Sequence, residues 1–249
     1  MKQLRPYPQV IVTKKAARAL AGGHPWVFEG EVIRVEPSPE SGKHAQNGCI
    51  VDVFEENGTY QGTGLLSEMS KIRVRIVTRN ANDRLNEAFW SRKISWAWEH
   101  RKTTMGNRAL PGIVDRYENV LVAQVGTVGM EHLRDAIYPL LLEVFSADGQ
   151  VIDGIYERND SPSRLKEGLP QYKDWWTGSS PDENGLITES LLSLPSTHVL
   201  ATENGLKFNL DLENSQKTGF FLDQKYNRRA VRQLAQGRRV LDCFCHVGP

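Results

Sequence analysis

Apolar and polar residues alternate with a period of two in several short segments near the start of the chain. In segment 71–77, Lys71, Arg73 and Arg75 alternate with branched apolar side chains. One face of this strand should therefore enter a core while the other presents three cations. Short strands at this spacing favour a small β-barrel. We expect its other strands at 10–12, 26–28, 50–54 and 62–66, and a short helix over 14–20 that ends at Gly22-Gly23.

The pattern changes after residue 82, where apolar residues recur three and four positions apart. Trp90, Ile94 and Trp98 predict a helix that Asp83 caps and that runs to about Lys102. A second apolar stripe predicts a helix over 133–144, and Pro139 within it should kink or restart that helix.

Strands are expected beside these helices, which makes the middle of the chain an α+β domain. Segments 113–117 and 120–125 predict a hairpin, and 151–157 predicts another strand. Segment 160–195 is rich in Pro, Gly, Ser and Asp, so we expect a loop with one short strand near 186–187. Within that loop, Trp175-Trp176 is expected to fold onto the core as a lid.

The last part of the chain combines a hairpin, a helix and a strand. The hairpin joins 199–203 to 206–212 around Asn204-Gly205, a strong turn signal. A helix with Val231 and Leu234 on its apolar face follows, and then a buried strand over 238–244. A buried strand that enters a small-residue turn is typical of a doubly wound α/β fold, whose first loop holds a nucleotide-like ligand. Because one strand cannot be buried alone, we expect the natural protein to continue beyond Pro249.

Composition and charge narrow the function classes. The 249 residues are 39% hydrophobic, with 31 basic and 30 acidic side chains and a mean hydropathy of −0.46, which is ordinary for a globular protein. No apolar run approaches the roughly 20 residues that span a bilayer, and no secretory signal begins the chain. These features predict a cytoplasmic protein with no membrane partner.

The charges are unevenly distributed along the chain. Residues 1–80 hold 11 basic and 8 acidic side chains, residues 81–192 hold 12 and 17, and residues 193–249 hold 8 and 5. The two basic ends could contact phosphate, which an acidic segment repels. Chance differences in the number of charged residues on solvent-exposed faces explain the same numbers, so both interpretations stay open.

The three cysteines argue against a disulfide framework, because Cys49 is far along the chain from Cys243 and Cys245. Cys243, Cys245 and His246 are too crowded and too few for a closed zinc site, so we expect no metal. Cys243 and Cys245 lie on and just after the expected buried strand, where packing or loop roles are more common than nucleophilic ones.

One run near the end, Lys217-Thr218-Gly219-Phe220-Phe221-Leu222-Asp223-Gln224, is the most specific motif in the chain. Weaker motifs occur at 23–28, 72–75, 110–117, 227–228 and 240–244. Together they resemble the S-adenosylmethionine-dependent rRNA cytosine-5 methyltransferases of the large-subunit type. The resemblance implies a mixed fold with a PUA-like β-barrel, a central α+β domain, a β-hairpin linker, and the start of a Rossmann-like α/β methyltransferase domain. We place these parts at residues 1–79, 83–195, 199–222 and 223–249.

The resemblance also implies S-adenosylmethionine as cofactor. The cofactor-binding residues carried over to this chain are Phe220, Phe221, Gln224, Asp242, Phe244, His246 and Gly248. Where the family commonly has Thr-Gly-Gly, this chain has Val247-Gly248-Pro249, and Pro249 lacks an N–H that the loop could offer the ligand. The family's catalytic Cys follows a later Asp-Pro-Pro-type loop. Neither is found here, so no catalytic residue is assigned and we expect this chain to be inactive alone.

The partner implied is large-subunit rRNA. The basic residues expected to contact it are Lys14, Lys15, Arg18, Arg73, Arg75 and Arg228, although solvated faces would also place cations there. His24 and Trp26 could form a stacking platform for RNA, but we expect Trp26 to pack in the barrel and His24 to satisfy a turn. A homodimer is a further expectation from the resemblance.

Two other functions remain as alternatives. The chain could be a non-catalytic RNA-binding module that acts through its barrel. A nicotinamide- or flavin-dependent oxidoreductase would require Gly-x-Gly-x-x-Gly after Leu241, where the chain has a single glycine, Gly248.

Overall fold

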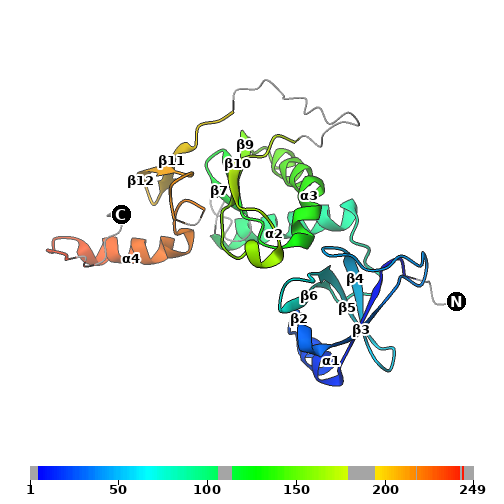
Figure 1. Ribbon diagram of the computed structural model, residues 1–249. Coiled ribbons are helices and arrows are strands. Elements are labelled where there is room, and N and C mark those ends of the chain that lie inside the picture. Colours follow the sequence, from blue (N-terminus) through cyan, green and yellow to red (C-terminus); the bar gives the residue numbers. More distant parts are fainter. Residues whose placement is uncertain (1–4, 106–113, 179–193, 217, 242, 244–249) are drawn as a thin grey trace.

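The computed structural model describes residues 5–105, 114–178, 194–216, 218–241 and 243, in three successive parts (Figure 1). The first part is a six-stranded sheet that curls around its own core, in the order β2-β6-β5-β4-β1-β3. Only the β1–β4 pair is parallel. Its elements are β1 (Gln9–Val12), α1 (Lys14–Ala21), β2 (Trp26–Phe28), β3 (Val32–Glu36), β4 (Ile50–Glu55), β5 (Tyr60–Leu66) and β6 (Ile72–Thr78). We call this part the barrel.

The core of the barrel is made by alternate residues of its strands and one face of α1. Val10, Leu20, Val27, Val53 and Val74 are all fully buried. The expected strands and helix are confirmed, because period-two alternation reports directly which face is buried. Strand β3 was not predicted: it is an edge strand, and its apolar residues Ile33 and Val35 face solvent.

A buried ion pair supports the barrel from the side. Arg5 donates from Nε and Nη2 to the two carboxylate oxygens of Asp52 at 2.6 and 2.8 Å, and Thr63 Oγ1 donates to the same carboxylate at 2.5 Å. Asp52 and Thr63 are fully buried and Arg5 nearly so. Hydrogen bonding to Asp52 raises the pKa of Arg5 above its ordinary value. Each charge therefore depends on the other for its burial.

The second part is a four-stranded sheet, in the order β10-β9-β8-β7, with two long helices that pack on each other. We call it the central domain. Its core includes Trp98, Leu121, Phe145 and Ile155. Its elements are α2 (Glu87–Met105), β7 (Val114–Tyr117), β8 (Val120–Ala123), α3 (Val128–Ala147), β9 (Gly154–Asn159) and β10 (Tyr172–Trp175).

Both helix predictions in the central domain need correction at a boundary. Asp83 does not cap α2: its carboxylate accepts from Thr78 Oγ1 at 2.6 Å, and Asn86 Oδ1 accepts from the N–H of Phe89 instead. Helix α3 begins at Val128 and does not restart at Pro139. One missing N–H is tolerated there because buried residues such as Tyr138 and Leu141 hold both sides of the proline against the core.

The strand predictions for the central domain are largely confirmed. The β7–β8 hairpin forms around Glu118, and β9 begins three residues later than expected. Trp175 belongs to a strand that was not predicted, β10, and packs against Tyr156, with ring centroids 5.1 Å apart. Trp176 meets Tyr138 edge-on at 5.3 Å, so the tryptophan pair does cover the core. The strand expected near 186–187 lies outside the described residues.

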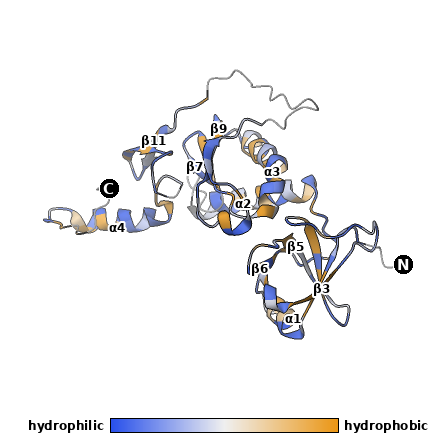
Figure 2. Ribbon diagram, viewed as in Figure 1, coloured by the Kyte–Doolittle hydropathy of each residue, from blue (hydrophilic) through white to orange (hydrophobic). Residues whose placement is uncertain are grey.

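The third part contains the hairpin β11 (His198–Glu203) and β12 (Leu206–Asp211), followed by α4 (Lys225–Ala235). The predicted turn is confirmed, with positive φ angles of 49° at Asn204 and 80° at Gly205. No side chain of α4, all of which is described, is buried. Hydrophobic residues in Figure 2 therefore lie on an open helix face, where Val231 is 56% and Leu234 is 65% exposed.

The buried strand expected over 238–244 is wrong for the residues that are described. Val240 and Leu241 are exposed and are not in a strand. A buried parallel strand needs neighbours on both sides, and no described segment pairs with this one. Cys243 is likewise exposed and lies outside any helix or strand, which agrees with a loop role and not with a packing role.

The barrel and the central domain meet in a tight seam. Arg75 of β6 pairs with Glu167, at 2.7 Å, and Ser67 donates a hydrogen bond to the same buried carboxylate. A Cβ on Gly129 of α3 would lie 2.7 Å from Leu65 Cβ, closer than side chains tolerate. The ion pair, the hydrogen bond and the close contact at Gly129 therefore hold the two parts together. No helix in the described part of the chain is long and apolar enough to cross a membrane.

Candidate functional site

The segment 218–222 lies between the hairpin and the central sheet and is held by side chains of β7. Tyr117 Oη accepts from the N–H of Phe220 at 2.9 Å and donates to the carbonyl of the same residue at 3.1 Å. Thr218 Oγ1 donates to Asp115 at 2.5 Å. Burial raises the pKa of Tyr117 to about 12, so its hydroxyl stays protonated and can serve both bonds.

A glycine is required next to this anchor. Gly219 has a φ of 149°, and a Cβ built on it would lie 3.1 Å from both Leu212 and Tyr117. The backbone can approach β7 this closely only because no side chain intervenes.

The hairpin is tied to the central domain by two further contacts. The buried Arg158 donates to the carbonyls of Leu212 at 2.6 Å and Ser215 at 3.1 Å. Glu118 Oε1 accepts from the N–H of Thr202 at 2.9 Å. These polar bonds supplement an apolar cluster, in which buried hairpin residues such as Leu212 pack against the central sheet.

Arg228 of α4 organises the aromatic centre of the site. It makes two 2.7 Å bonds to the carboxylate of Glu203 and one of 2.9 Å to the carbonyl of Phe221. Its guanidinium also lies 4.1 Å from the ring centroid of Phe220, whose ring centroid is 4.9 Å from that of Phe208. Ion pairing and stacking thus fix the Phe220 side chain and the start of α4 at once.

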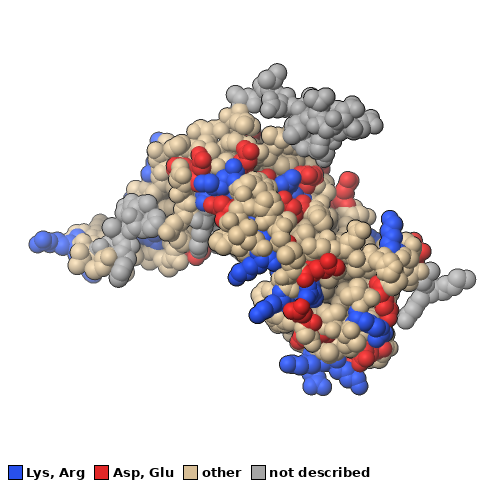
Figure 3. Space-filling model, viewed as in Figure 1, with Lys and Arg blue, Asp and Glu red and all other residues tan. Residues whose placement is uncertain are grey.

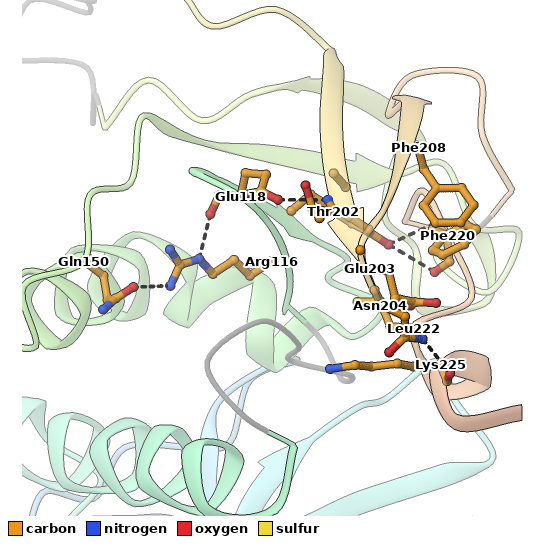
Figure 4. A pocket seen from close by; sticks show the side chains of 13 residues that line it. Arg116, Glu118, Gln150, Thr202, Glu203, Asn204, Phe208, Phe220, Leu222 and Lys225 are labelled. Carbon is orange, nitrogen blue, oxygen red and sulfur yellow. Dashed lines mark hydrogen bonds between the residues drawn. The ribbon is translucent and has the colours of Figure 1, made fainter. Parts of the chain in front are cut away.

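Two clefts flank Phe220. The first, with a volume of about 420 Å³, lies between the β7–β8 turn, the hairpin and α4 (Figure 4). On the central-domain side of Figure 4, Arg116 donates to the carbonyl of Glu118 at 2.7 Å and to Gln150 Oε1 at 2.8 Å. Burial lowers the pKa of Arg116. This cleft is polar on one wall and aromatic on the other.

The second cleft, of about 330 Å³, has a largely aromatic wall made by Phe208, Phe220 and Phe221. Lys207 and Arg228 add positive charge at its edge. Of the residues expected to bind cofactor, Phe220 and Phe221 line this cleft. Gln224 is exposed and lines neither cleft; its side chain accepts instead from Asn227 at 2.8 Å. Asp242, Phe244, His246 and Gly248 lie outside the described residues.

Comparison with known proteins identifies the relatives of the chain. Residues 10–79 match the family model of the PUA-like domain, and residues 186–248 match that of the S-adenosylmethionine-dependent methyltransferases. Ribosomal RNA large subunit methyltransferase I of Shewanella amazonensis is 33% identical over 245 residues, which are 93% of this chain and 56% of the relative. The chain is a homologue of this methyltransferase. The protein of the same name from Photobacterium profundum is 30% identical, over 96% of this chain and 58% of the relative.

The chain therefore spans somewhat more than half the length of the methyltransferases that it matches. A solved Streptococcus mutans protein, assigned to the SAM-dependent methyltransferases, superposes with a TM-score of 0.62 at 17% identity. The match covers 90% of this chain and 53% of that one. A second solved chain, assigned to the methyltransferases and complexed with SAH, gives a TM-score of 0.61. These likenesses confirm the expected fold class, with its PUA-like N-terminal domain.

The aromatic cleft of this methyltransferase homologue fits part of S-adenosylmethionine. The ligand presents a flat adenine and a positively charged sulfonium, and both are attracted to aromatic faces. The rings of Phe220 and Phe221 would supply such a surface. The positive edge made by Lys207 and Arg228 would suit the ligand's carboxylate better than its sulfonium.

The cations expected to contact RNA fall into two groups. Lys14, Lys15 and Arg18 are exposed along α1, on the side opposite the buried Leu20. Lys and Arg side chains gather at that end of the barrel in Figure 3. This group leaves its charges facing solvent, as a phosphate-binding surface requires.

The second group is engaged within the protein. The alternation predicted for β6 is confirmed, with Val74 buried and Arg73 and Arg75 on the outer face. Arg73, however, pairs with Glu29, and Arg75 pairs with Glu167 across the seam. Arg228 pairs with Glu203. These three arginines have a structural role here, and their contact with RNA stays a prediction.

Trp26 is not where the sequence placed it. Val27 fills the core, and Trp26 points outward with 42% of its surface exposed. The expectation that Trp26 packs in the barrel is therefore wrong. His24 does satisfy a turn, since its Nδ1 accepts from the N–H of Trp26 at 3.3 Å.

The residues missed by sequence reasoning are those that hold the site together. Tyr117, Arg158 and Glu203 contact partners that lie 25 to 103 residues away along the chain. The alternation of Asp115 and Tyr117 around Arg116 does show that both side chains leave the same face of β7. Nothing in the sequence shows what they meet there.

Proposed function

We propose that the protein transfers a methyl group from S-adenosylmethionine to C5 of a cytosine in large-subunit rRNA. The observation that carries this proposal is the similarity of 93% of the chain to ribosomal RNA large subunit methyltransferase I, at 33% identity. The aromatic cleft beside Phe220 and the exposed cations of α1 support the cofactor and the RNA parts of it, respectively.

Bound in this cleft, S-adenosylmethionine would supply an electrophilic methyl group. Phe220 and Phe221 would contact it, and the position of Phe220 is fixed by contacts within the protein. Tyr117 fixes the backbone of Phe220, while Phe208 and Arg228 fix its ring. A wall that is already in place costs little further ordering when a ligand binds.

Methyl transfer to C5 also requires a thiolate that adds to C6 of the cytosine and a base that removes the C5 proton. The cytosine would leave its base stack to reach them. Cys49 suits neither role, because it packs against the barrel core and burial raises the pKa of its thiol. In line with the resemblance, we propose that the 249 residues bind RNA and contribute part of the cofactor site, but do not transfer the methyl group by themselves.

The exposed cations of α1 also support the alternative function, a non-catalytic RNA-binding module that acts through the PUA-like domain. Both functions predict salt-sensitive RNA binding, since each phosphate contact releases counterions. Only the first predicts a modified nucleotide. The proposal further includes a cytoplasmic location and a homodimer, and sedimentation over a range of protein concentrations tests the latter.

Deletion of the gene in its own organism separates the two functions. Bisulfite sequencing of large-subunit rRNA should lose one 5-methylcytosine, and the intact gene should restore it. An intact gene that encodes Phe220→Ala should restore less of it, while one that encodes Phe54→Ala, altered at a barrel phenylalanine, serves as the matched control. An rRNA whose methylation pattern is unchanged by the deletion would contradict methyl transfer and leave the RNA-binding module.

A further inference from the structure

Three aromatic rings stand together on the outer side of strand β2 and have no role in the site described above. Ring centroids are 5.8 Å apart for His24 and Trp26, 5.9 Å for His24 and Phe28, and 6.3 Å for Trp26 and Phe28. Trp26 is 42% exposed and Phe28 is 39% exposed. We call these three residues the aromatic platform.

The platform is built on rigid backbone. Val27, between Trp26 and Phe28, is fully buried in the barrel core, which forces its two neighbours outward. The N–H of Phe28 donates to Glu31 at 2.9 Å, and Arg79 donates to the carbonyl of His24, also at 2.9 Å. The backbone that carries the rings is therefore held in one place, although the rings themselves face solvent.

Exposed aromatic rings on a folded domain usually mark a binding surface rather than a packing defect. Strand β2 is an edge strand of the sheet, so an extended ligand can reach it from outside. Aliphatic residues are also exposed in the barrel, but Ile33 and Val35 are on β3, the opposite edge strand. The β2 edge thus presents rings and the β3 edge presents aliphatic side chains.

The charges around the platform favour an anionic ligand. Lys71 and Arg79 are exposed beside it: the carbonyl of Lys71 accepts from Glu29, the residue after Phe28, and Arg79 bonds to His24. The acids nearby are engaged within the protein, since Glu29 pairs with Arg73 and Glu31 accepts from Phe28. Rings flanked by cations are the combination that binds unpaired nucleotides, because bases stack on rings while cations meet the phosphates.

We propose that the aromatic platform stacks unpaired bases of RNA, at a place in the fold separate from the candidate cofactor cleft. This proposal rests on RNA being the substrate, as proposed above. The platform would distinguish single-stranded or looped RNA from duplex, whose bases are stacked on one another and offer no free face. The α1 cations would instead bind either kind of RNA through phosphate.

Two substitutions in the full chain test the platform. Trp26→Leu and Phe28→Leu keep an apolar side chain and remove the ring, while Ile33→Ala on β3 is a control with the same 42% exposure as Trp26. The probes are a fluorescent single-stranded RNA and a duplex of the same composition, read by anisotropy across a salt series. We expect each ring substitution to weaken single-strand binding by about 5- to 100-fold with an unchanged salt slope, and to leave duplex binding as it was.

The control variants make the result decisive. Replacing Lys14, Lys15 and Arg18 with Ala should lower the salt slope for both probes, by about 2 for single strands. If Trp26→Leu and Phe28→Leu weaken binding of both probes equally, or of neither, the proposed role of the platform is wrong, although the chain still binds RNA. Concentration-dependent self-association that Trp26→Leu abolishes would show that the rings bind a second copy instead. A chain that binds neither RNA would contradict the RNA substrate of the proposed function, which is a different failure.

Discussion

The barrel and the C-terminal helix α4 are held in place by opposite means. In the barrel, Val10, Val27, Val74 and their neighbours are fully buried, and most of the stability comes from removing apolar surface from water. In the C-terminal part, the hairpin packs against the central sheet through residues such as Leu212. Helix α4, by contrast, buries no side chain, and Arg228 holds it through hydrogen bonds to Glu203 and Phe221. Apolar burial in the barrel does not require a particular partner for each residue. The position of α4 depends on a few specific pairs.

This difference carries over to function. The barrel places its candidate RNA-binding groups, the α1 cations and the aromatic platform, outside a core that does not need them. The C-terminal part uses the same residues for structure and for the candidate site: Arg228 pairs with Glu203 and also covers the ring of Phe220. Substitutions of these surface groups of the barrel should therefore change binding without changing stability. Substitutions around Phe220 should change both.

The largest effect should come from the one place where the barrel depends on a specific polar pair. Asp52→Ala leaves Arg5 buried without its partner, so we expect the free energy of unfolding to fall by about 3–5 kcal/mol. Urea denaturation followed by tryptophan fluorescence measures this. Arg34→Ala, which breaks the exposed pair between Arg34 and Glu36, is the control and should cost less than about 1 kcal/mol. Equal losses would mean that the Asp52 pair is not buried as described.

The same substitution in two helices compares the two regions directly. Leu20 of α1 is fully buried and Leu234 of α4 is 65% exposed. Leu20→Ala should lower the free energy of unfolding by about 3 kcal/mol through lost burial and a cavity. Leu234→Ala should change it by less than about 0.5 kcal/mol. A large loss for Leu234→Ala, measured by the same denaturation, would show that the open face of α4 is covered in solution.

A smaller effect is expected at the anchor of the C-terminal part. Tyr117→Phe keeps the ring but removes the hydroxyl that serves both the N–H and the carbonyl of Phe220. The loss should be about 1–3 kcal/mol, read as faster amide hydrogen exchange at 218–222. Tyr226→Phe removes an exposed hydroxyl with a single 3.5 Å contact and should have little effect.

The pH dependence of that loss tests its cause. Burial raises the pKa of Tyr117 from 10 in the unfolded chain to about 12, so the neutral hydroxyl is favoured when folded. The contribution of this hydroxyl to the free energy of unfolding is complete below pH 10 and disappears as the pH rises towards 12. The stability difference between the natural chain and Tyr117→Phe should therefore narrow over this range. A constant difference would contradict burial of the hydroxyl.

Sequence patterns were sufficient where the deciding contacts are local. Alternation in 71–77 located β6, and Asn204-Gly205 located the β11–β12 turn, because each signal depends on neighbouring residues alone. Phe220 and Phe221 were assigned to the site from a resemblance, and the cleft they line is consistent with that assignment.

The sequence patterns were insufficient where a residue could occupy either of two environments. Asp83 could cap α2 or bind Thr78, and only the folded position of β6 decides for Thr78. Trp26 and Val27 are both apolar, and the register of β2 against β6 sends the valine inward. The partners of Arg73, Arg75 and Arg228 are carboxylates 25 to 92 residues away. A sequence shows these cations but not the acids that engage them.

The seam at Glu167 has a consequence for how the molecule moves. Sliding the barrel along α3 would drive Leu65 into the backbone of Gly129, and opening the seam would separate Arg75 from a buried carboxylate. Either motion would break these contacts. We therefore expect the barrel and the central domain to reorient together in solution, so that the ¹⁵N relaxation of both reports one shared rotational correlation time.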